Sequence, residues 1–231
     1  MEAIVLAGGF GTRLREVVPD LPKPMAPVAG RPFLEIVLRS LATRGFTRVV
    51  LALGYKADVI ATHFGDTFEG MAIVHVVESE PLGTGGAIRQ ALARCEADHV
   101  FIFNGDTYLA LEAAEIEACW QTWHEPIVVA RAVPDTARYG RVEMEAGRFT
   151  QFSEKGTAGP GLINAGCYVF PRDLLDAFSV GVPFSLETDF LASAVKQQAF
   201  RLFVTEGMFI DIGVPADYLR AQTDLADVER R

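Results

Sequence analysis

Short apolar runs alternate with segments of helical periodicity along the first half of the chain. Such runs, bounded by turn residues, are typical of buried strands. The expected strands are residues 3–6, 48–53, 72–77, 99–103 and 127–131, and the expected helices are residues 33–43, 56–63, 86–97 and 112–124. Because nearly continuous apolar strands separated by helices form parallel sheets with both faces covered, this half predicts an α/β sheet flanked by helices.

The second half is richer in strands. The pattern predicts short strands at residues 141–145, 148–154 and 165–170, with turns at residues 139–141 and 146–148. A helix at residues 186–197, a strand at 200–204 and a closing helix at 216–228 follow. Neither an internal repeat nor a linker interrupts the sequence, so a single domain over residues 1–231 with one mixed, mainly parallel sheet is predicted.

Composition and charge narrow the classes of function. The hydrophobic fraction of 50% is sufficient for a large core, and the formal net charge of −9 argues against a nucleic-acid partner. The sequence shows neither a signal peptide nor an apolar run of the roughly 20 residues that span a bilayer. Three widely spaced cysteines fit reduced thiols. A cytoplasmic protein without a membrane partner is therefore expected.

The first expected strand runs into a glycine-rich turn. Gly8, Gly9 and Gly11 leave the backbone bare, so consecutive N–H groups can surround phosphate oxygens. Arg13 and Lys23 supply positive charge for the same phosphates. The spacing fits neither the dinucleotide fingerprint nor the P-loop. The turn thus predicts a nucleoside triphosphate site, the alternative being a plain tight turn beside a solvated arginine.

Two carboxylates follow apolar strands. Asp106 ends the segment FNGD and Asp211 lies in FIDIG, each next to a glycine. Open α/β sheets bind ligands beyond the carboxyl ends of their strands, and Mg2+ prefers oxygen ligands. The pair predicts a magnesium site, although each aspartate alone could be a turn or helix cap.

Other polar positions predict contacts with a base and a sugar. The small residues of Gly83–Ala87 would let a flat base lie against the backbone, or they form a loose loop before a helix. Glu154 and Lys155 could hold a sugar phosphate or form a surface ion pair. Asn164 and Glu187 have side chains suited to sugar hydroxyls, or they serve a turn and the first turn of a helix.

Seven segments together resemble the sugar-1-phosphate nucleotidylyltransferases. They are LAGGFGTRL (6–14), LPKPMAPVAGRPFLE (21–35), PLGTGGAI (81–88), FNGD (103–106), FSEK (152–155), INAGCYVF (163–170) and FIDIGVPADY (209–218). The resemblance covers nearly the whole chain and is greatest for the guanylyltransferases that act on D-glycero-α-D-manno-heptose 1-phosphate. Residues 16–20 depart from the Pro-x-Thr stretch of many relatives, which leaves the geometry of that loop open.

The resemblance implies a Rossmann-like, GT-A-like fold in which about residues 1–110 bind the nucleotide and about 111–231 bind the sugar phosphate. It implies nucleotide contacts by Leu6, Ala7, Gly8, Gly9, Gly11, Thr12, Arg13, Lys23, Gly83, Thr84 and Gly86. It implies sugar-phosphate contacts by Asn104, Gly105, Tyr139, Gly140, Glu154, Lys155, Asn164 and Glu187. The implied catalytic residues are Arg13, Lys23 and Asp106, and the implied Mg2+ ligands are Asp106 and Asp211.

The implied reaction joins GTP and the heptose 1-phosphate to give GDP-heptose and pyrophosphate. The alternatives are a uridylyl- or thymidylyltransferase for another sugar 1-phosphate, such as a hexose or N-acetylmuramic acid, or a nucleotide-sugar sensor without activity. The intact set of Arg13, Lys23, Asp106 and Asp211 speaks against a sensor. Members of the family often form dimers or tetramers, so a homo-oligomer is possible.

Overall fold

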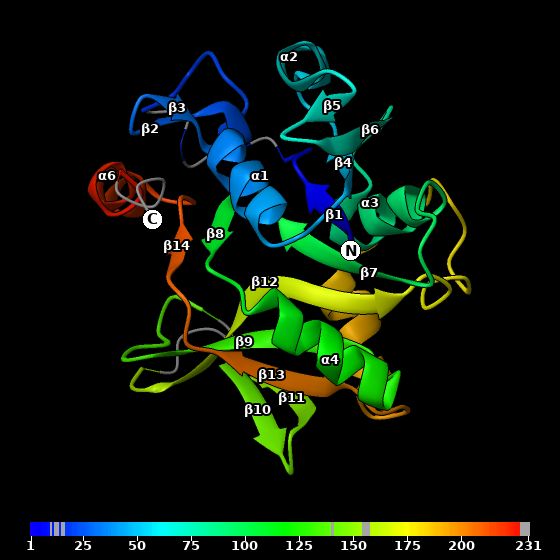
Figure 1. Cartoon of the computed structure of the whole chain (residues 1–231). Helices are drawn as coiled ribbons and strands as arrows, with labels where there is room; N and C mark the ends of the chain where they lie inside the picture. Colours follow the sequence, from blue (N-terminus) through cyan, green and yellow to red (C-terminus); the bar gives the residue numbers. More distant parts are fainter. Residues whose placement is uncertain (10, 12–13, 15–16, 140, 154–157, 227–231) are drawn as a thin grey trace.

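A mixed sheet of ten strands forms the centre of the molecule. The computed structural model describes residues 1–9, 11, 14, 17–139, 141–153 and 158–226. The strands are β1 (Glu2–Leu6), β4 (Arg48–Leu53), β5 (Thr67–Phe68), β6 (Met71–Val77), β7 (His99–Asn104), β9 (Ile127–Val133), β10 (Arg141–Glu145), β11 (Arg148–Ser153), β12 (Gly161–Pro171) and β13 (Arg201–Thr205). Their order is β10-β11-β13-β9-β12-β7-β1-β4-β6-β5 (Figure 1).

The parallel part of the sheet has β1 at its centre. β1 pairs in parallel with β4 through the register Leu6↔Ala52 and with β7 through Leu6↔Asn104. The chain proceeds from β1 to β4 and β6 on one side and returns to β7 on the other. In open α/β sheets, such a reversal of strand order opens a crevice beyond the carboxyl ends of the strands. Segments that leave β1 and β7 therefore line a natural ligand site.

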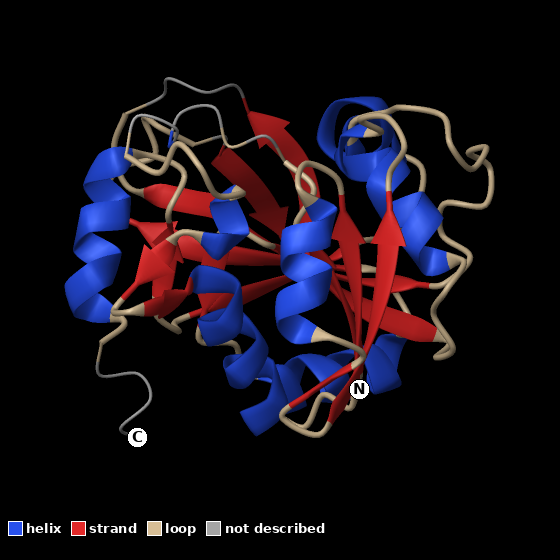
Figure 2. Ribbon diagram, turned by 90° about the horizontal axis from the view of Figure 1, so that it is seen from above, coloured by secondary structure: helices blue, strands red, loops and turns tan. Residues whose placement is uncertain are grey.

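Helices cover both faces of the sheet, and Figure 2 shows the same layers from above. The helices are α1 (Phe33–Thr43), α2 (Ala57–Phe64), α3 (Gly83–Leu92), α4 (Ala113–Trp123), α5 (Ala192–Ala194) and α6 (Pro215–Asp224), with a π-helical turn η3 (Leu186–Leu191). Side chains alternate along each strand, so Ala3 and Val5 belong to the core under α1 and α4, and Ile4 belongs to the core under α3 and η3. Both predicted layers and the mixed sheet are confirmed.

Two small two-stranded sheets stand apart from the main sheet. β2 (Pro27–Val28) pairs with β3 (Arg31–Pro32), just after a 3-10 turn, η2 (Lys23–Met25). β14 (Phe209–Asp211) pairs antiparallel with β8 (Thr107–Leu109), matching Asp211 with Thr107. The sequence pattern predicts neither pairing, because strands this short carry too little periodicity.

Several elements differ in extent from the sequence prediction. Helix α3 starts at Gly83 rather than residue 86 and stops at Leu92 rather than residue 97. Its glycine-rich first turn is stabilised from outside, because the N–H groups of Gly85 and Gly86 donate to the carbonyl of Phe184. The helix expected at 186–197 is only η3 followed by α5. β12 is longer than expected because it continues through a bulge between Asn164 and Cys167.

Cys95, Cys119 and Cys167 are free, and Cys119 is only partly buried. Within the described ranges, no helix has both the length and the apolar character needed to cross a membrane.

Candidate functional site

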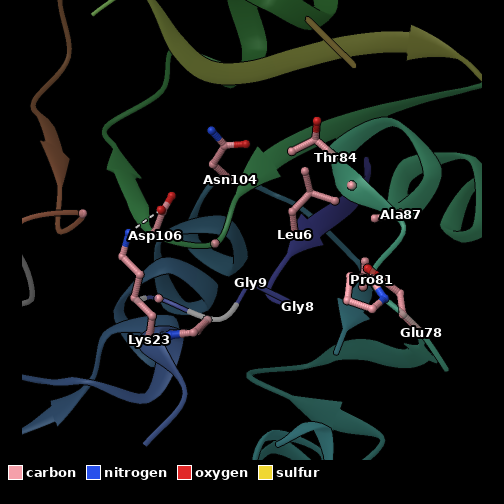
Figure 3. Close-up of a pocket in the computed structure, with 16 residues that line it drawn as sticks. Leu6, Gly8, Gly9, Lys23, Glu78, Pro81, Thr84, Ala87, Asn104 and Asp106 are labelled. Atoms are coloured by element: carbon pink, nitrogen blue, oxygen red, sulfur yellow. Dashed lines mark hydrogen bonds and ion pairs between the residues drawn. The ribbon is translucent and has the colours of Figure 1, made fainter. Parts of the chain in front are cut away.

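A cavity of about 370 Å³ lies beyond the carboxyl ends of β1 and β7 and beside the start of α3 (Figure 3). The glycine turn after β1 forms its floor, and the loop after β6 closes one end. It is lined by Leu6, Gly8, Gly9, Gly11, Lys23, Pro24, Ala52, Glu78, Pro81, Gly83, Thr84, Ala87, Asn104, Gly105, Asp106 and Gly213. Ten of these positions belong to the set predicted from the sequence. Ala7 and Gly86, which also belong to that set, do not line the cavity.

The glycine turn brings its backbone close to Lys23. Gly11 has φ of +57°, and a Cβ atom there would lie 2.7 Å from Cβ of Lys23. Any other residue would be strained and would push Lys23 away. Gly9 has nothing within 4 Å of a Cβ position, so its surface faces open space. The turn thus positions a lysine as well as leaving room for a ligand.

Lys23 forms an ion pair with Asp106 at one end of the cavity. Its Nζ donates to Oδ2 of Asp106, and the two side chains are 10% and 37% exposed. Figure 3 shows this pair at the opposite end of the cavity from Glu78. A Cβ atom on Gly213 would lie 2.7 Å from Oδ1 of Asp211 and 3.3 Å from Nζ of Lys23. The lysine ammonium therefore lies close to both aspartates.

The β8–β14 strand pair brings the two aspartates together. The Ile212 N–H donates to the Asp106 carbonyl at 3.0 Å, and the Gly213 N–H donates to Oδ1 of Asp211 at 2.6 Å. Burial raises the pKa of the Asp211 carboxyl, the negative charge of Asp106 raises it further, and Lys23 opposes the shift. The two like charges are held together at a cost that a bound cation would relieve.

Glu78 places a carboxylate at the other end of the cavity. Its Oε2 accepts from the Leu82 N–H at 2.9 Å, and its Oε1 lies near Gly8, 3.1 Å from a Cβ position there. Partial burial raises the pKa of Glu78, and the bond from Leu82 partly offsets this. The sequence prediction missed this residue. Its place directly after the apolar strand β6 is the signal that identified Asp106 and could have identified Glu78 as well.

Packing explains much of the glycine requirement between Gly83 and Gly86. A Cβ on Gly85 would lie 2.2 Å from the Phe184 ring, and one on Gly86 would lie 2.8 Å from the Val182 carbonyl. Gly83 lines the cavity but also abuts the Phe184 carbonyl, 2.6 Å from a Cβ position. The alternative of a loose loop is wrong, because this segment is the tightly packed first turn of α3.

A second cavity of about 400 Å³ adjoins the first and shares Asn104 and Asp106 with it. Its lining residues are Asn104, Asp106, Thr107, Arg138, Tyr139, Phe152, Asn164, Ala165, Gly166, Glu187, Phe209, Asp211 and Val214. Burial raises the pKa of the Tyr139 hydroxyl. The predicted residues Asn104, Tyr139, Asn164 and Glu187, distant in sequence, meet here. Gly105 lines only the first cavity.

Asn164 holds Glu187 in place within the second cavity. Its Nδ2 donates to Oε1 of Glu187 at 2.9 Å and to the Tyr168 hydroxyl at 2.6 Å, and its Oδ1 accepts from the Gly166 N–H. The bulge in β12 turns Asn164 toward the cavity, a common use of bulges beside functional sites. The capping alternative also holds in part, because Ser185 accepts from the Thr188 N–H.

Some predicted residues cannot be placed, and some lining residues were not predicted. Thr12, Arg13, Gly140, Glu154 and Lys155 lie outside the described residues. Arg138 and Gly213 line the cavities without having been predicted. Arg138 directly precedes the expected turn at residues 139–141, of which Tyr139 and Gly140, but not Arg138, were predicted to contact the sugar phosphate.

Comparison with known proteins identifies the class. The model of the nucleotidyl transferase family matches residues 2–228. The chain therefore belongs to the nucleotidyl transferase family, which confirms the resemblance and the predicted fold. Two D-glycero-α-D-manno-heptose 1-phosphate guanylyltransferases are similar to it along their whole length. The one from Aneurinibacillus thermoaerophilus is 39% identical, covering 97% of this chain and 98% of the relative, and the one from Campylobacter jejuni is 38% identical, covering 94% and 97%.

A solved structure shows the same likeness in three dimensions. The crystal structure of HddC from Yersinia pseudotuberculosis complexed with GMP-PN matches with a TM-score of 0.87 and 36% identity. The match covers 96% of this chain and 98% of that chain.

Proposed function

We propose that the protein transfers the guanylyl group of GTP to D-glycero-α-D-manno-heptose 1-phosphate, releasing pyrophosphate and GDP-heptose. The observation that carries this proposal is that two cavities of suitable size meet at Asp106, where Lys23 and Asp211 also lie. A nucleotide in the first cavity and a sugar phosphate in the second would bring their phosphates together there. The heptose and guanine assignments rest on the two similar guanylyltransferases and on HddC.

The first cavity suits the nucleotide. The bare backbone of Gly8, Gly9 and Gly11 would surround phosphate oxygens, as nests of N–H groups do in phosphate sites. Lys23 would exchange its bond to Asp106 for a phosphate oxygen. Thr12 and Arg13 are proposed to complete this phosphate site, in keeping with their place in the sequence. Residues 1–110 would thus supply most of the nucleotide site.

Asp106 and Asp211 fit a magnesium ion that also binds the substrates. Within the described part of the chain, no three His, Cys, Asp or Glu side chains are grouped to hold a metal by themselves. Mg2+ in nucleotide sites commonly takes one or two carboxylates and completes its shell with phosphates and water. The repulsion that raises the pKa of Asp211 is what a cation would remove. When bound, the ion would neutralise phosphate charge and orient the reacting groups.

The reaction requires the protein to position the two substrates and to stabilise their negative charge. A phosphate oxygen of the sugar 1-phosphate attacks the α-phosphorus of GTP, the bond to the β-phosphate oxygen breaks, and pyrophosphate leaves. Both reactants are anions, so Lys23 would stabilise the charge that gathers as they approach. The second cavity would hold the sugar, with Glu187 and Asn164 binding hydroxyl groups. Tyr139, Gly140, Glu154 and Lys155 are proposed to take part on the same side.

Glu78 favours guanine among the bases. Guanine presents two adjacent donors, N1–H and the 2-amino group, which match a carboxylate, whereas uracil and thymine present one donor between two acceptors. Figure 3 shows Glu78 at the end of the cavity farthest from Lys23 and Asp106, beside Gly8 at the start of the glycine turn. Because Coulomb repulsion falls with distance, its charge would act least on the phosphate that reacts beside Lys23 and Asp106.

Replacing Glu78 by glutamine is expected to reduce the preference for GTP over ITP by about 10-fold or more, because ITP lacks the 2-amino group and a charge-assisted hydrogen bond has about this effect. The measurement is kcat/KM for both nucleotides. Glu80→Gln is the matched control, since Glu80 is an exposed glutamate two residues away. An unchanged GTP/ITP ratio in Glu78→Gln would remove Glu78 from base recognition.

Pyrophosphate release tests the function itself. The protein would be assayed with GTP, UTP or dTTP against a panel of heptose, mannose, glucose and N-acetylmuramic acid 1-phosphates. We expect release to be fastest with GTP and the heptose 1-phosphate. Release only with UTP or dTTP would overturn the guanylyl assignment, and no release with any pair would favour a sensor.

A further inference from the structure

The second cavity is strongly acidic for a pocket that would receive a sugar phosphate. Asp106, Asp211 and Glu187 line it, and Arg138 is the one cationic side chain among its described lining residues. A sugar 1-phosphate carries its negative charge on the group that must come nearest to the two aspartates. Such a dianion requires positive charge on its approach side as well as at the metal position.

Arg138 is held in a fixed position at this cavity. It follows β9 in the loop that leads to Tyr139, and its Nη2 donates to Oδ2 of Asp217 at 2.6 Å. Asp217 lies in the first turn of α6, and its side chain is only 9% exposed. A guanidinium has five N–H donors, and this bond uses only one of them. A planar fork anchored at one corner is well suited to bind phosphate through the others.

Asp217 is shared between two guanidinium groups. Nη1 of Arg220 lies 3.6 Å from Oδ1 of the same carboxylate, and Nε of Arg220 lies 3.5 Å from Oδ2 of Asp224. The Arg138 guanidinium also lies 5.7 Å from the centre of the Tyr139 ring. Tyr139 in turn contacts Phe209, whose ring lies 6.3 Å away on the strand that carries Asp211. These contacts put Arg138 on the Asp211 side of the cavity, where the phosphate rather than the sugar ring would lie.

Electrostatics agrees with this placement. The pKa of Arg138 is raised chiefly by its bond to Asp217, and the charge of Asp211 contributes to the same shift. The Arg138 guanidinium therefore interacts electrostatically with Asp211, the carboxylate that we propose as a metal ligand.

We propose that Arg138 binds the phosphate group of the incoming sugar 1-phosphate and that Asp217 is the positioning residue that aims it. The inference rests on the proposed function and extends it to the second substrate. Arg138 stays charged throughout and takes part in no bond change. It holds the attacking phosphate in place despite the repulsion from Asp106, Asp211 and Glu187.

The test is steady-state kinetics of Arg138→Ala and Arg138→Lys with both substrates varied. Loss of a charge-assisted phosphate contact is expected to raise KM for the heptose 1-phosphate about 10–100-fold, while KM for GTP changes less than about 2-fold. Arg138→Lys should recover part of the loss, because it restores the charge without the planar fork. Asp217→Asn should shift the same KM in the same direction by a smaller factor.

Arg220→Ala is the matched control. Arg220 has the same exposure as Arg138 and the same partner, but it does not line the cavity. We expect it to leave both KM values within about 2-fold, because an exposed charge outside the site is screened by salt.

Three results would overturn the inference. If Arg138 only ties α6 to the loop after β9, Arg138→Ala will lower the melting temperature and leave the KM for sugar phosphate unchanged, or raise both KM values alike. If Arg220→Ala matches Arg138→Ala, the effect is one of general charge. Wild-type protein that is inactive with every substrate pair would overturn the proposed function and this inference with it. An active wild type, together with an Arg138→Ala variant whose KM for the sugar phosphate is unchanged, would overturn this inference alone.

Discussion

Replacing Lys23 by methionine is expected to lower nucleotidyl transfer by about 10²–10³-fold and, at the same time, to tighten binding of Mn2+ to the nucleotide-free protein. The first effect follows from the loss of a preorganised cation beside the reacting phosphates. The second follows from the ion pair, because the Lys23 ammonium lies against Asp106 and close to Asp211. A metal ion entering the nucleotide-free site must displace this ammonium, and methionine removes the competitor while keeping a side chain of similar length.

Metal binding would be measured by titration calorimetry with Mn2+ as the probe, and turnover by pyrophosphate release. Lys196→Met is the control, since Lys196 is exposed and lines neither cavity. Weaker Mn2+ binding in Lys23→Met would show that the lysine assists the metal in the nucleotide-free protein. Normal turnover would remove Lys23 from the transfer chemistry altogether.

Replacing Asp211 by asparagine is expected to reduce activity by about 10² or more without reducing the stability of the metal-free protein. Burial and the neighbouring charge of Asp106 raise the pKa of Asp211, so the ionised form destabilises the fold at neutral pH. Asparagine has nearly the same shape and can still accept the bond from the Gly213 N–H. The melting temperature of the metal-free variant should therefore equal or exceed that of the wild type.

The pH dependence gives this prediction a definite sign. A carboxyl whose folded-state pKa is raised costs stability at high pH, and the cost disappears once the pH falls below the unfolded-state value. The advantage of Asp211→Asn in melting temperature should thus shrink as the pH is lowered through the pKa of Asp211. Added Mg2+ should raise the melting temperature of the wild type but much less that of the variant. The exposed Asp66→Asn serves as a control, and a metal-free variant that melts well below wild type would contradict the prediction.

These predictions share a physical basis in the charge distribution. A protein with a formal net charge of −9 must gather cations locally before it can bring two phosphate compounds together. The described residues show two such places, Lys23 beside Asp106 and near Asp211, and Arg138 in the lining of the second cavity. Both cations are paired with carboxylates, which keeps them oriented. We therefore expect a phosphate to be bound without a large rearrangement of side chains.

The sequence was a good guide wherever a local pattern was strong. The apolar strands 3–6 and 48–53 and the helix 33–43 appear in the structure within a residue of their expected limits. The hydrophobic pattern was a poor guide where tertiary contacts, rather than intrinsic helix or strand propensity, stabilise an element. Helix α3 includes glycines that disfavour helix, and the Phe184 carbonyl stabilises its first turn. The short β8–β14 pair depends on contacts between residues about a hundred positions apart, which no local window records.

By itself the sequence determined the class of fold, the glycine turn after the first strand and the carboxylates at strand ends, because these features follow from hydrophobic period and from residue chemistry next to a strand. Only the tertiary structure decided which side chains meet. It paired Lys23 with Asp106, set Asp211 beside them and brought Glu78 to one and Arg138 to the other of two adjoining cavities. The physical reason is that charge–charge effects act over a few ångströms in space, and separation along the chain carries no information about that distance.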